Sequence, residues 1–555
     1  MDTELLLEAL TLAAVKAGIP TPRVVFDFPS ELSHGDLTTN LALVHAKEVG
    51  DAPRSLAEKV VAKLPAIPGI ELVNIAGPGF INFTYTKDVL TAVVHEAHTK
   101  GEQWGEGEEL QGATIMVEHS QPNPFKPFHI GHLMSNTIGE SLVRLLENQQ
   151  ARVIRANYQG DVGLHIAKAI WGMQKLGTDP KDVEAIGKAY AHGAQLYEKD
   201  DTVKGEIDAL NMKVYEKTDG VVNELYDLGR EASLKRFDEL YSVLGSSFDR
   251  FYFESETAGI GQKVVEAHPD IFPLSEGARV FKGEEYGLHT RVFLTSKGLP
   301  TYEAKELGLE TLKSQEYPEC DEFIITTAVE QKGVFLIIKK ALEIINPALG
   351  AKLSHISHGM MLLPTGKMSS RTGEVVTGES LLIALVDKAR ERAKESRAED
   401  ADLLAQQVAV AAIKFQILKQ AAGKDAVFEE ERALSLDGDS GPYLQYAHAR
   451  CVSIFEKAKE AGIKSKADAA LVPGEITRLL VRFPQVAQRS AEERAAHHIA
   501  TYLIQLAGEF NSWYAREQFL DGTDAAPARI ALVEAVQHTL KNGLALLGIQ
   551  APDKM

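Results

Sequence analysis

The segment Pro122-Asn123-Pro124-Phe125-Lys126-Pro127-Phe128-His129-Ile130-Gly131-His132 separates two stretches of very different hydrophobic pattern. Before it, Thr114–Glu118 is a short apolar run of the kind that forms a buried strand. After it, apolar residues recur at every fourth position, as in an amphipathic helix: Met134, Ile138, Leu142 and Leu146. Arg152–Ala156 then has the pattern of the next strand. Strand, loop, helix and strand in this order predict a parallel sheet.

The proline-rich loop itself has features of a nucleotide-binding site. It leads from a strand into the start of a helix, where free N–H groups and partial positive charge attract phosphate. Gly131 has no Cβ, so a flat base or ribose can approach the backbone. His129 and His132 share one face of the first helical turn and can donate hydrogen bonds to phosphate oxygens, while Lys126 adds a cation. Taken alone, two such histidines would more often simply cap the helix.

A second loop, Gly366-Lys367-Met368-Ser369-Ser370-Arg371-Thr372-Gly373, lies far downstream. It is bounded by glycines, carries cationic and hydroxyl side chains, and follows a predicted strand. Such a loop can hinge at both ends and close over a triphosphate. Alone it would usually be a surface turn, so its interpretation depends on the first loop.

The sequence predicts three domains. Residues 1–105 have the pattern of a compact α+β unit, and residues 106–380 contain the parallel sheet with a helical insertion near 170–280. Residues 381–555 have the pattern of an almost entirely helical domain. Beyond the insertion, three segments have the pattern of further strands: Val292–Leu294, Glu322–Thr326 and Gly359–Leu363.

Composition excludes several classes of protein. The chain has 555 residues, 45% of them apolar, which rules out a disordered chain, collagen and a disulfide scaffold. Its formal net charge is −19, but residues 441–555 carry 13 basic and 12 acidic side chains, so a basic face for nucleic acid is compatible with the acidic total. Two cysteines, an acidic N-terminus and short apolar runs indicate a cytoplasmic protein without membrane contact.

The two loops together resemble the paired nucleotide-binding motifs of class I aminoacyl-tRNA synthetases: His129-Ile130-Gly131-His132 and Lys367-Met368-Ser369-Ser370. The wider sequence is similar to the arginyl-tRNA synthetase family. Asn123 and Lys126 stand at that family's offsets before the first histidine. Other motifs of the family follow in order along nearly the whole chain: His34-Gly35-Asp36, Gly77-Pro78-Gly79-Phe80, Asn157-Tyr158-Gln159-Gly160-Asp161, Gly441–Arg450 and Ala551–Met555.

The resemblance implies an α/β fold with a class I Rossmann-like parallel-sheet catalytic domain. It places an N-terminal α+β add-on domain that contacts tRNA before the catalytic domain, and an all-helical anticodon-binding domain after it. It also implies an enzyme that condenses L-arginine with ATP to arginyl-adenylate and transfers the arginyl group to the 3′-terminal ribose of tRNA(Arg), first to the 2′-hydroxyl.

The family generally activates arginine only when tRNA is bound, so the same requirement is expected here. Magnesium would accompany ATP, held by phosphates and water. No dedicated protein metal site is visible in the sequence. The protein is expected to be a monomer.

Candidate site residues are carried over one by one from the family's motifs. The catalytic group comprises Lys126, His129, His132 and Lys367. The wider ATP site comprises Pro122, Asn123, Lys126, His129, Gly131, His132, Lys367, Met368, Ser369 and Ser370. The arginine site, which needs carboxylates for a buried guanidinium, comprises Glu118, Asn123, Tyr302, Glu306 and Gln331. The tRNA contacts comprise Phe80, Asn82, Tyr446, Tyr514 and Met555, in part because single-stranded bases stack on aromatic side chains.

Three positions depart from the family pattern. Glu306 stands where the family usually has aspartate, so the arginine pocket must be arranged differently or the assignment fails. Val162 replaces the usual tryptophan after the Gly-Asp pair. Ser370 replaces the second lysine of the downstream loop, and Lys126 and Arg371 are the two candidates for its role.

Two other functions compete with this interpretation. A non-catalytic tRNA-binding paralogue would lose its chemical residues first, yet His129, His132, Lys126 and Lys367 are all present. Another nucleotidyltransferase of the same fold would not need the N-terminal domain or residues 440–555.

Overall fold

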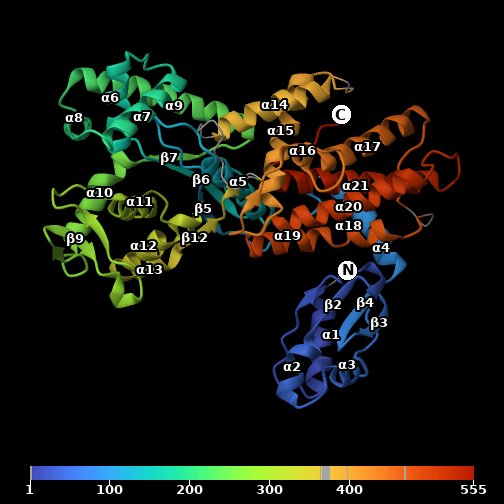
Figure 1. Ribbon diagram of the computed structural model, residues 1–555. Helices are drawn as coiled ribbons and strands as arrows, with labels where there is room; N and C mark the ends of the chain where they lie inside the picture. Colours follow the sequence, from blue (N-terminus) through green and yellow to red (C-terminus); the bar gives the residue numbers. More distant parts are fainter. Residues whose placement is uncertain are drawn as a thin grey trace. The chain divides into compact units, whose positions relative to one another are not determined.

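Figure 1 presents a computed structural model of the chain, which describes residues 3–29, 31–362, 364, 376–394, 396, 398–467 and 471–555. The chain forms two compact units. The first unit comprises Met1–Gly105, Ala447–Val486 and Tyr502–Asn542, and the second comprises Glu106–Tyr446, Ala487–Thr501 and Gly543–Met555. The loop Pro122–His132 therefore lies within the second unit.

The second unit is built on a five-stranded sheet in the order β12-β11-β5-β6-β7. All neighbouring strands in it are parallel. The strands are β5 (Thr114–Glu118), β6 (Arg152–Gln159), β7 (Arg250–Phe253), β11 (Glu322–Ala328) and β12 (Leu353–His358). The chain runs outward from β5 to β6 and β7, and later returns to β11 on the other side of β5. The parallel α/β fold expected from the sequence is confirmed.

Helices connect these strands. They are α5 (Ile130–Asn148), α6 (Leu164–Leu176), α7 (Val183–Tyr197), α8 (Asp201–Glu216), α9 (Gly220–Leu244), α10 (Glu254–Ala267), α11 (Tyr302–Glu316), α12 (Lys332–Ile345) and α13 (Pro347–Lys352), with short 3-10 helices η3 (Gly283–Tyr286) and η4 (Val329–Gln331). Helices α6 to α9 occupy most of the segment predicted as a helical insertion. That segment also contains β7, an edge strand of the sheet.

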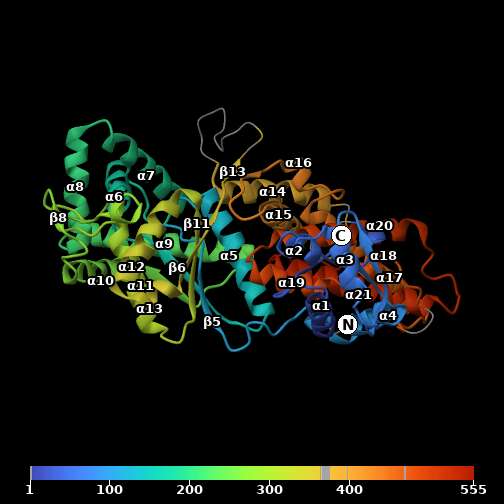
Figure 2. The ribbon, with the colours of Figure 1, turned by 90° about the horizontal axis from the view of Figure 1, so that it is seen from below.

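Helices cover both faces of the sheet, and β5 shows how its side chains divide between them. Ile115 and Val117 pack into one apolar cluster with residues of α5. Met116 lies in a different cluster with residues of α11 and α12. Figure 2 shows α5 on one side of β6 and β11, and α11 and α12 on the other. Because side chains alternate along a strand, Glu118 is on the same face as Met116, toward α11.

Strands lie within all three segments predicted beyond the insertion, but two of these strands are outside the parallel sheet. Val292–Leu294 lies in β10 (Arg291–Leu294), which joins a separate antiparallel sheet with β8 (Leu274–Ser275) and β9 (Ala278–Phe281). Gly359–Leu363 overlaps β13 (Met361–Leu362), which pairs with β14 (Ala426–Val427). The strand that completes the main sheet is β12. Its sequence, Leu-Ser-His-Ile-Ser-His, is too polar to resemble the apolar run of a buried parallel strand.

The N-terminal part of the first unit is an α+β structure, as expected, with a four-stranded antiparallel sheet in the order β1-β2-β4-β3. Its elements are α1 (Thr3–Lys16), β1 (Phe26–Asp27), η1 (Leu32–His34), β2 (Leu37–Thr39), α2 (Leu41–Val49), α3 (Pro53–Val61), β3 (Ile70–Ala76), β4 (Phe80–Tyr85), α4 (Lys87–Lys100) and η2 (Gly101–Gln103). Arg478 donates to Asp36 Oδ1 at 2.6 Å, so C-terminal helices of the same unit pack on this region.

The remainder of the chain is helical, as the sequence predicts. The helices are α14 (Gly378–Ala393), α15 (Ala401–Leu418), α16 (Glu430–Ala433), α17 (Gly441–Glu460), α18 (Glu475–Leu480), α19 (Phe483–Glu492), α20 (His497–Arg516) and α21 (Ala526–Leu546). Within the described part of the chain, α15 is the one helix long and apolar enough to cross a membrane. Because 72% of it is buried inside the protein, it has the character of a core helix.

Candidate active site

The order of the strands fixes where a ligand would bind. Successive strands are added on one side of β5, whereas β11 lies on its other side. In open parallel sheets, ligands bind at such a switch point, beyond the carboxyl ends of the strands. Glu118 ends β5, Asn123 follows it, and Gln331 ends η4 directly after β11. The fold therefore brings these three predicted residues to one edge of the sheet.

The two histidines form a reciprocal cap at the start of α5. The main-chain N–H of His132 donates to Nδ1 of His129 at 3.3 Å, and the N–H of His129 donates to Nδ1 of His132 at 3.2 Å. Their rings stack with centroids 3.4 Å apart. Since both Nδ1 atoms accept, each neutral ring carries its proton on Nε2. The histidines thus cap the helix and still keep two N–H donors that the cap does not use.

Burial keeps both rings neutral. Desolvation, followed by the charge of Lys126, lowers the pKa of His129 to about 4. Burial lowers the pKa of His132 well below its ordinary value, and His129 and Lys126 add to that effect. Burial also lowers the pKa of Lys126, while Glu254 acts to raise it. At neutral pH the site therefore offers two uncharged imidazole donors beside the Lys126 amine.

Gly131 and Gly160 each make room for a side chain of the site. A Cβ on Gly131 would lie 3.0 Å from the His129 ring, and one on Gly160 would lie 2.7 Å from Oδ1 of Asn123. The same oxygen accepts a hydrogen bond from the Gly160 N–H at 2.8 Å. Gly131 thus permits the histidine cap, a role the sequence did not reveal. Asn123, next to Pro122 in the loop, is fixed to the end of β6.

The chain after the downstream loop is attached to the first loop. His129 and Thr377 form an antiparallel bridge, and the Gly378 N–H donates to the carbonyl of Phe128 at 2.9 Å. Arg371, the alternative cation, lies outside the described residues. The downstream residues predicted for the ATP site lie outside them as well: Lys367, Met368, Ser369 and Ser370.

A cluster of four buried charged side chains lies on the α11 face beyond β5, and we call it the acidic pocket: Glu118, Glu306, Glu310 and Lys313. The Lys313 ammonium donates to Oε2 of Glu118 and, at 2.7 Å, to Oε1 of Glu310. Gln121 donates from Nε2 to the other oxygen of Glu118 at 2.6 Å. Both oxygens of Glu118 are therefore engaged.

Glu306 is a member of the pocket with an unused acceptor. Its side chain is 1% exposed, so it is not a solvent-facing helix residue. Tyr302, one turn earlier on α11, is hydrogen-bonded to it, but its Oε2 has no hydrogen-bond partner among the described residues. Burial and then the charge of Glu118 raise the pKa of Glu306 well above its ordinary value. Oε2 of Glu306 is thus a buried acceptor that no group among the described residues satisfies.

Sequence reasoning missed Glu310 and Lys313. Burial alone would lower the pKa of Lys313, but Glu118 and Glu310 raise it above its ordinary value, so it stays an ammonium. Burial raises the pKa of Glu310, against the effect of Lys313. The signal was present in the spacing, because Tyr302, Glu306 and Glu310 recur every fourth residue and Lys313 follows three later. All four thus share one face of a helix.

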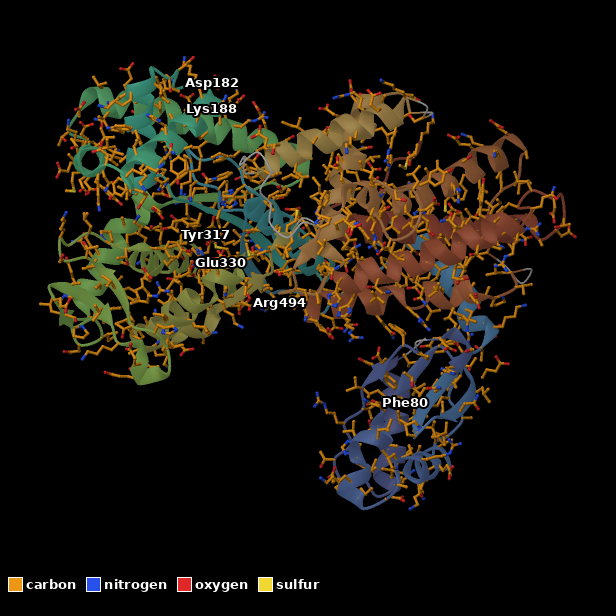
Figure 3. All side chains as sticks on the ribbon, viewed as in Figure 1. Phe80, Asp182, Lys188, Tyr317, Glu330 and Arg494 are labelled. Carbon is orange, nitrogen blue, oxygen red and sulfur yellow. The ribbon has the colours of Figure 1, made fainter. Side chains whose placement is uncertain are left out.

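Two predicted tRNA contacts lie on β4 of the first unit. Phe80, labelled in Figure 3, is 39% exposed. Asn82 is 5% exposed, and its side-chain oxygen accepts a hydrogen bond from the Thr38 hydroxyl. Phe80 is therefore the more accessible of the two for an RNA base.

The other predicted tRNA contacts belong to different units. Tyr514 on α20 lies in the first unit, where the guanidinium carbon of Arg450 is 5.1 Å from the centre of its ring. Arg450 also donates to Oδ1 of Asn511 at 2.6 Å. Tyr446 and Met555 lie in the second unit, and both are half-buried. Tyr514 thus presents an aromatic ring beside a guanidinium, a pair that the sequence did not reveal.

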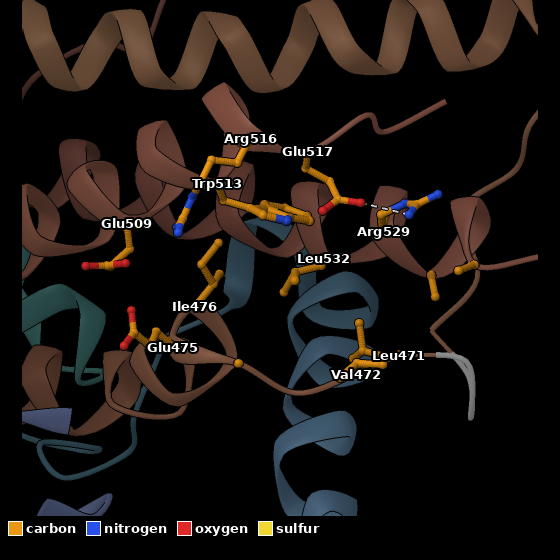
Figure 4. A pocket seen from close by; sticks show the side chains of 13 residues that line it. Leu471, Val472, Glu475, Ile476, Glu509, Trp513, Arg516, Glu517, Arg529 and Leu532 are labelled. Carbon is orange, nitrogen blue, oxygen red and sulfur yellow. Dashed lines mark hydrogen bonds and ion pairs between the residues drawn. The ribbon is translucent and has the colours of Figure 1, made fainter. Parts of the chain in front are cut away.

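The first unit also contains a cavity of about 380 Å³ between α18, α20 and α21 (Figure 4). Its walls include Trp513, Ile476 and Leu532, together with three acidic side chains, Glu475, Glu509 and Glu517. Glu475 is hydrogen-bonded to Glu509, and burial followed by this neighbour raises the pKa of Glu509. The residues that line this cavity include none of the predicted site residues, so it is distinct from the nucleotide motifs.

Three families match consecutive parts of the chain. Residues 3–85 match "Arginyl tRNA synthetase N terminal domain", residues 94–429 match "tRNA synthetases class I (R), catalytic domain", and residues 444–555 match "DALR anticodon binding domain". Among curated proteins, the chain is 30% identical to an arginine–tRNA ligase of Clostridioides difficile, over 95% of this chain and 97% of the relative. It is also 30% identical to an arginine–tRNA ligase of Limosilactobacillus reuteri over the full length of both.

Solved structures agree with these matches. The chain superposes on Thermus thermophilus arginyl-tRNA synthetase with a TM-score of 0.84 and 26% identity, covering 100% of both chains. It shares its fold with a Plasmodium falciparum arginyl-tRNA synthetase, with a TM-score of 0.78, 20% identity and 99% coverage of both.

Proposed function

Because the chain belongs to the arginyl-tRNA synthetase family and is a class I arginine–tRNA ligase, we propose that the loop Pro122–His132 and the acidic pocket form its active site. The enzyme uses ATP, L-arginine and tRNA(Arg). In the first step, a carboxylate oxygen of arginine attacks the α-phosphorus of ATP, and pyrophosphate leaves. In the second step, a hydroxyl of the terminal ribose of tRNA attacks the arginyl carbonyl, and AMP leaves. The 2′-hydroxyl is the first acceptor.

Support for this proposal comes from two complementary sets of side chains, one at the start of α5, which follows β5, and one on α11, whose Lys313 reaches Glu118 at the end of β5. The α5 end supplies neutral N–H donors of His129 and His132, which suit phosphate oxygens whose charge grows in the transition state. The α11 face supplies the free acceptor of Glu306, which suits a guanidinium. Arginine and ATP have these two chemistries.

The ATP half of the site works by positioning and charge stabilisation. His129 and His132 donate from Nε2 to the triphosphate, and Lys126 contributes its amine on the approach side. Lys367 and Ser370 of the downstream loop, with Met368 and Ser369 between them, would complete the site. The bridge between His129 and Thr377 supports this role, since it attaches the chain that follows that loop to the first histidine. Lys126 is the preferred substitute for the second lysine that Ser370 replaces.

The arginine half recognises the cation of the substrate. Glu306 accepts from the guanidinium, with Glu118 as its neighbour and Tyr302 holding Glu306 in place. Asn123 and Gln331 contact the amino-acid end, where their amides match its ammonium and carboxylate. Glu306 is one methylene longer than the family's aspartate, so its carboxylate would reach one bond further toward the ligand.

The remaining assignments follow from the family. Magnesium enters with ATP, held by phosphates and water; among the described residues, no three His, Cys, Asp or Glu side chains are grouped to hold a metal ion. We assign an N-terminal tRNA-contacting domain to residues 1–105, the catalytic domain to 106–380 and the anticodon-binding domain to 381–555. The enzyme works as a monomer in the cytoplasm. Phe80, Asn82, Tyr446, Tyr514 and Met555 contact tRNA.

Arginine activation in this enzyme requires bound tRNA, a proposal that rests on the family's general requirement and on Ser370, which stands where the downstream loop would carry its second lysine. The test is arginine-dependent ATP–pyrophosphate exchange with and without tRNA(Arg). We expect clear exchange with tRNA and negligible exchange without it. Strong exchange in RNA-free protein would refute the requirement. Absence of exchange even with tRNA, in protein that binds tRNA, would refute the active-site assignment.

A further inference from the structure

The acidic pocket contains more carboxyl groups than cations. Glu118, Glu306 and Glu310 are buried together, and within the described part of the chain the Lys313 ammonium pairs with two of them, Glu118 and Glu310. If all three carboxyl groups were ionised, the cluster would carry two uncompensated negative charges away from water. An unpaired buried charge is costly enough that the group usually takes up a proton instead.

The hydrogen bonds show where this proton can reside. Glu118 is fully engaged by Lys313 and Gln121, so it is the carboxylate of the pocket. Glu306 and Glu310 each keep one oxygen, Oε2, without a hydrogen-bond partner among the described residues. Both side chains are at most 1% exposed. The proton is therefore held by the pair Glu306 and Glu310, which lie one turn apart on α11.

Other ionisable groups around the pocket do not supply the missing positive charge. On β6, Tyr158 donates to or accepts from the Thr257 hydroxyl at 2.9 Å, and burial raises its pKa well above the ordinary value. The pKa of Tyr302 is also raised well above its ordinary value, by burial and then by the charge of Glu306. The next cation along α11, Lys305, is paired with Glu254 at 2.7 Å.

We propose that arginine enters this pocket in exchange for a proton, which the Glu306–Glu310 pair holds in the free enzyme and releases when the guanidinium binds. The inference rests on the proposed function, because it takes the acidic pocket as the guanidinium site. Lys313 is the permanent cation of the pocket, and Glu310 is a positioning residue that sets the number of protons. The exchange is balanced: the carboxyl O–H bond breaks, the proton passes to the buffer, and the guanidinium keeps its own protons.

The exchange has a measurable pH dependence. Where the pair is protonated in the free enzyme, each unit of rising pH makes the apparent affinity for arginine tenfold tighter. Above the pH at which the pair loses its proton in the free enzyme, the apparent affinity for arginine no longer depends on pH. His129 does not imitate this effect near neutrality, because burial and Lys126 lower its pKa to about 4.

The experiment is calorimetric titration of L-arginine into the full-length protein, with and without saturating tRNA(Arg), in phosphate and in Tris at the same pH. The two buffers take up a proton with different heats, so the difference in binding heat gives the protons released per arginine. We expect about one proton for the wild-type protein at pH 7 and a tenfold loss of affinity per unit below it.

Glu310→Gln removes one carboxyl at nearly constant size, so the pocket should then bind arginine with close to no proton release and a flat pH profile. A purely structural role for Glu310 would weaken binding but leave the proton count at one. The matched control is Glu316→Gln, on the same helix, whose carboxylate pairs with Arg250 at the protein surface. It should keep the wild-type count.

Two failures can be told apart. If the wild-type protein binds arginine and Glu306→Gln weakens that binding, but no proton is released, the proton exchange is wrong and the pocket stands. If Glu118→Gln and Glu306→Gln both leave arginine affinity unchanged, the assigned pocket itself is wrong. The Glu310→Gln variant could fail to fold, and a loss of its tRNA affinity would reveal this. The proton count of the wild-type protein would still show whether arginine binding releases a proton.

Discussion

Replacing Glu306 by glutamine should weaken arginine recognition and leave ATP recognition intact. The substitution keeps the size of the side chain and its contact with Tyr302, but removes the anionic acceptor whose Oε2 is unused in the buried pocket. Removing one partner of a buried, hydrogen-bonded charge pair costs about 2–5 kcal/mol. That range corresponds to roughly a 30-fold to 4,000-fold loss of affinity.

The structure favours the lower part of this range. Burial and the charge of Glu118 raise the pKa of Glu306 well above its ordinary value. Part of the interaction with the guanidinium therefore goes into removing a proton, and the net loss should be about 30-fold to 300-fold. Lys313 keeps its two carboxylate partners in the variant, so the fold should tolerate the change.

The assay is the initial rate of tRNA charging with varied arginine and saturating ATP, and then with the two reversed. The arginine KM should rise and the ATP KM should change less than about threefold, since a few tenths of a kcal/mol is the usual effect at an uninvolved site. Glu316→Gln, on the same helix, should match the wild type in both. An unchanged arginine KM for Glu306→Gln would show that this residue only fills the core of α11.

Three further predictions test other parts of the account. His132→Ala removes one Nε2 donor and should slow adenylate formation, measured as tRNA-dependent pyrophosphate exchange, by about a hundredfold or more. Its tRNA affinity should be unchanged. A decrease in the exchange rate below about tenfold would contradict the role of His132 on phosphate. At saturating arginine, the kcat for exchange should show no imidazole titration near pH 6.5. The pKa of His129 is about 4, so its protonation matters only as the pH falls toward that value. A kcat that halves near pH 6.5 would mean that the rings are charged during catalysis. Tyr514→Ala should weaken tRNA binding in a filter or fluorescence assay by about 1–3 kcal/mol without changing the arginine KM, because stacking on one base is worth about that much; equal tRNA affinity would remove Tyr514 from the RNA surface.

The parts of the fold that the sequence predicts correctly are those specified by local pattern. The apolar run Thr114–Glu118 is β5 to the residue, and the four-residue stripe after it is α5. The polar strand β12 was missed because its pattern is that of a half-exposed strand. Val292–Leu294 is a strand as predicted, but nothing in three residues states which sheet they join. Pairing partners are set by tertiary packing, which a local pattern does not contain.

The candidate site divides in the same way. His129, His132 and Lys126 are neighbours in sequence, so their motif predicts their proximity. Their charge state could not be predicted, because it depends on burial by the surrounding chain. The acidic pocket joins residues almost 200 positions apart, Glu118 and Lys313, through a contact that only the folded sheet creates. The helical spacing on α11 could have identified Glu306, Glu310 and Lys313 as one group. It could not have identified Glu118 on β5 as their partner.

The most direct test of the central claim is aminoacylation of a total tRNA pool by the purified protein with ATP and each amino acid in turn. The account predicts that arginine is attached, that the product carries it on the terminal ribose, and that lysine is attached poorly, because its compact ammonium does not match a site built for a planar cation. Attachment of another amino acid, with none of arginine, would contradict the account.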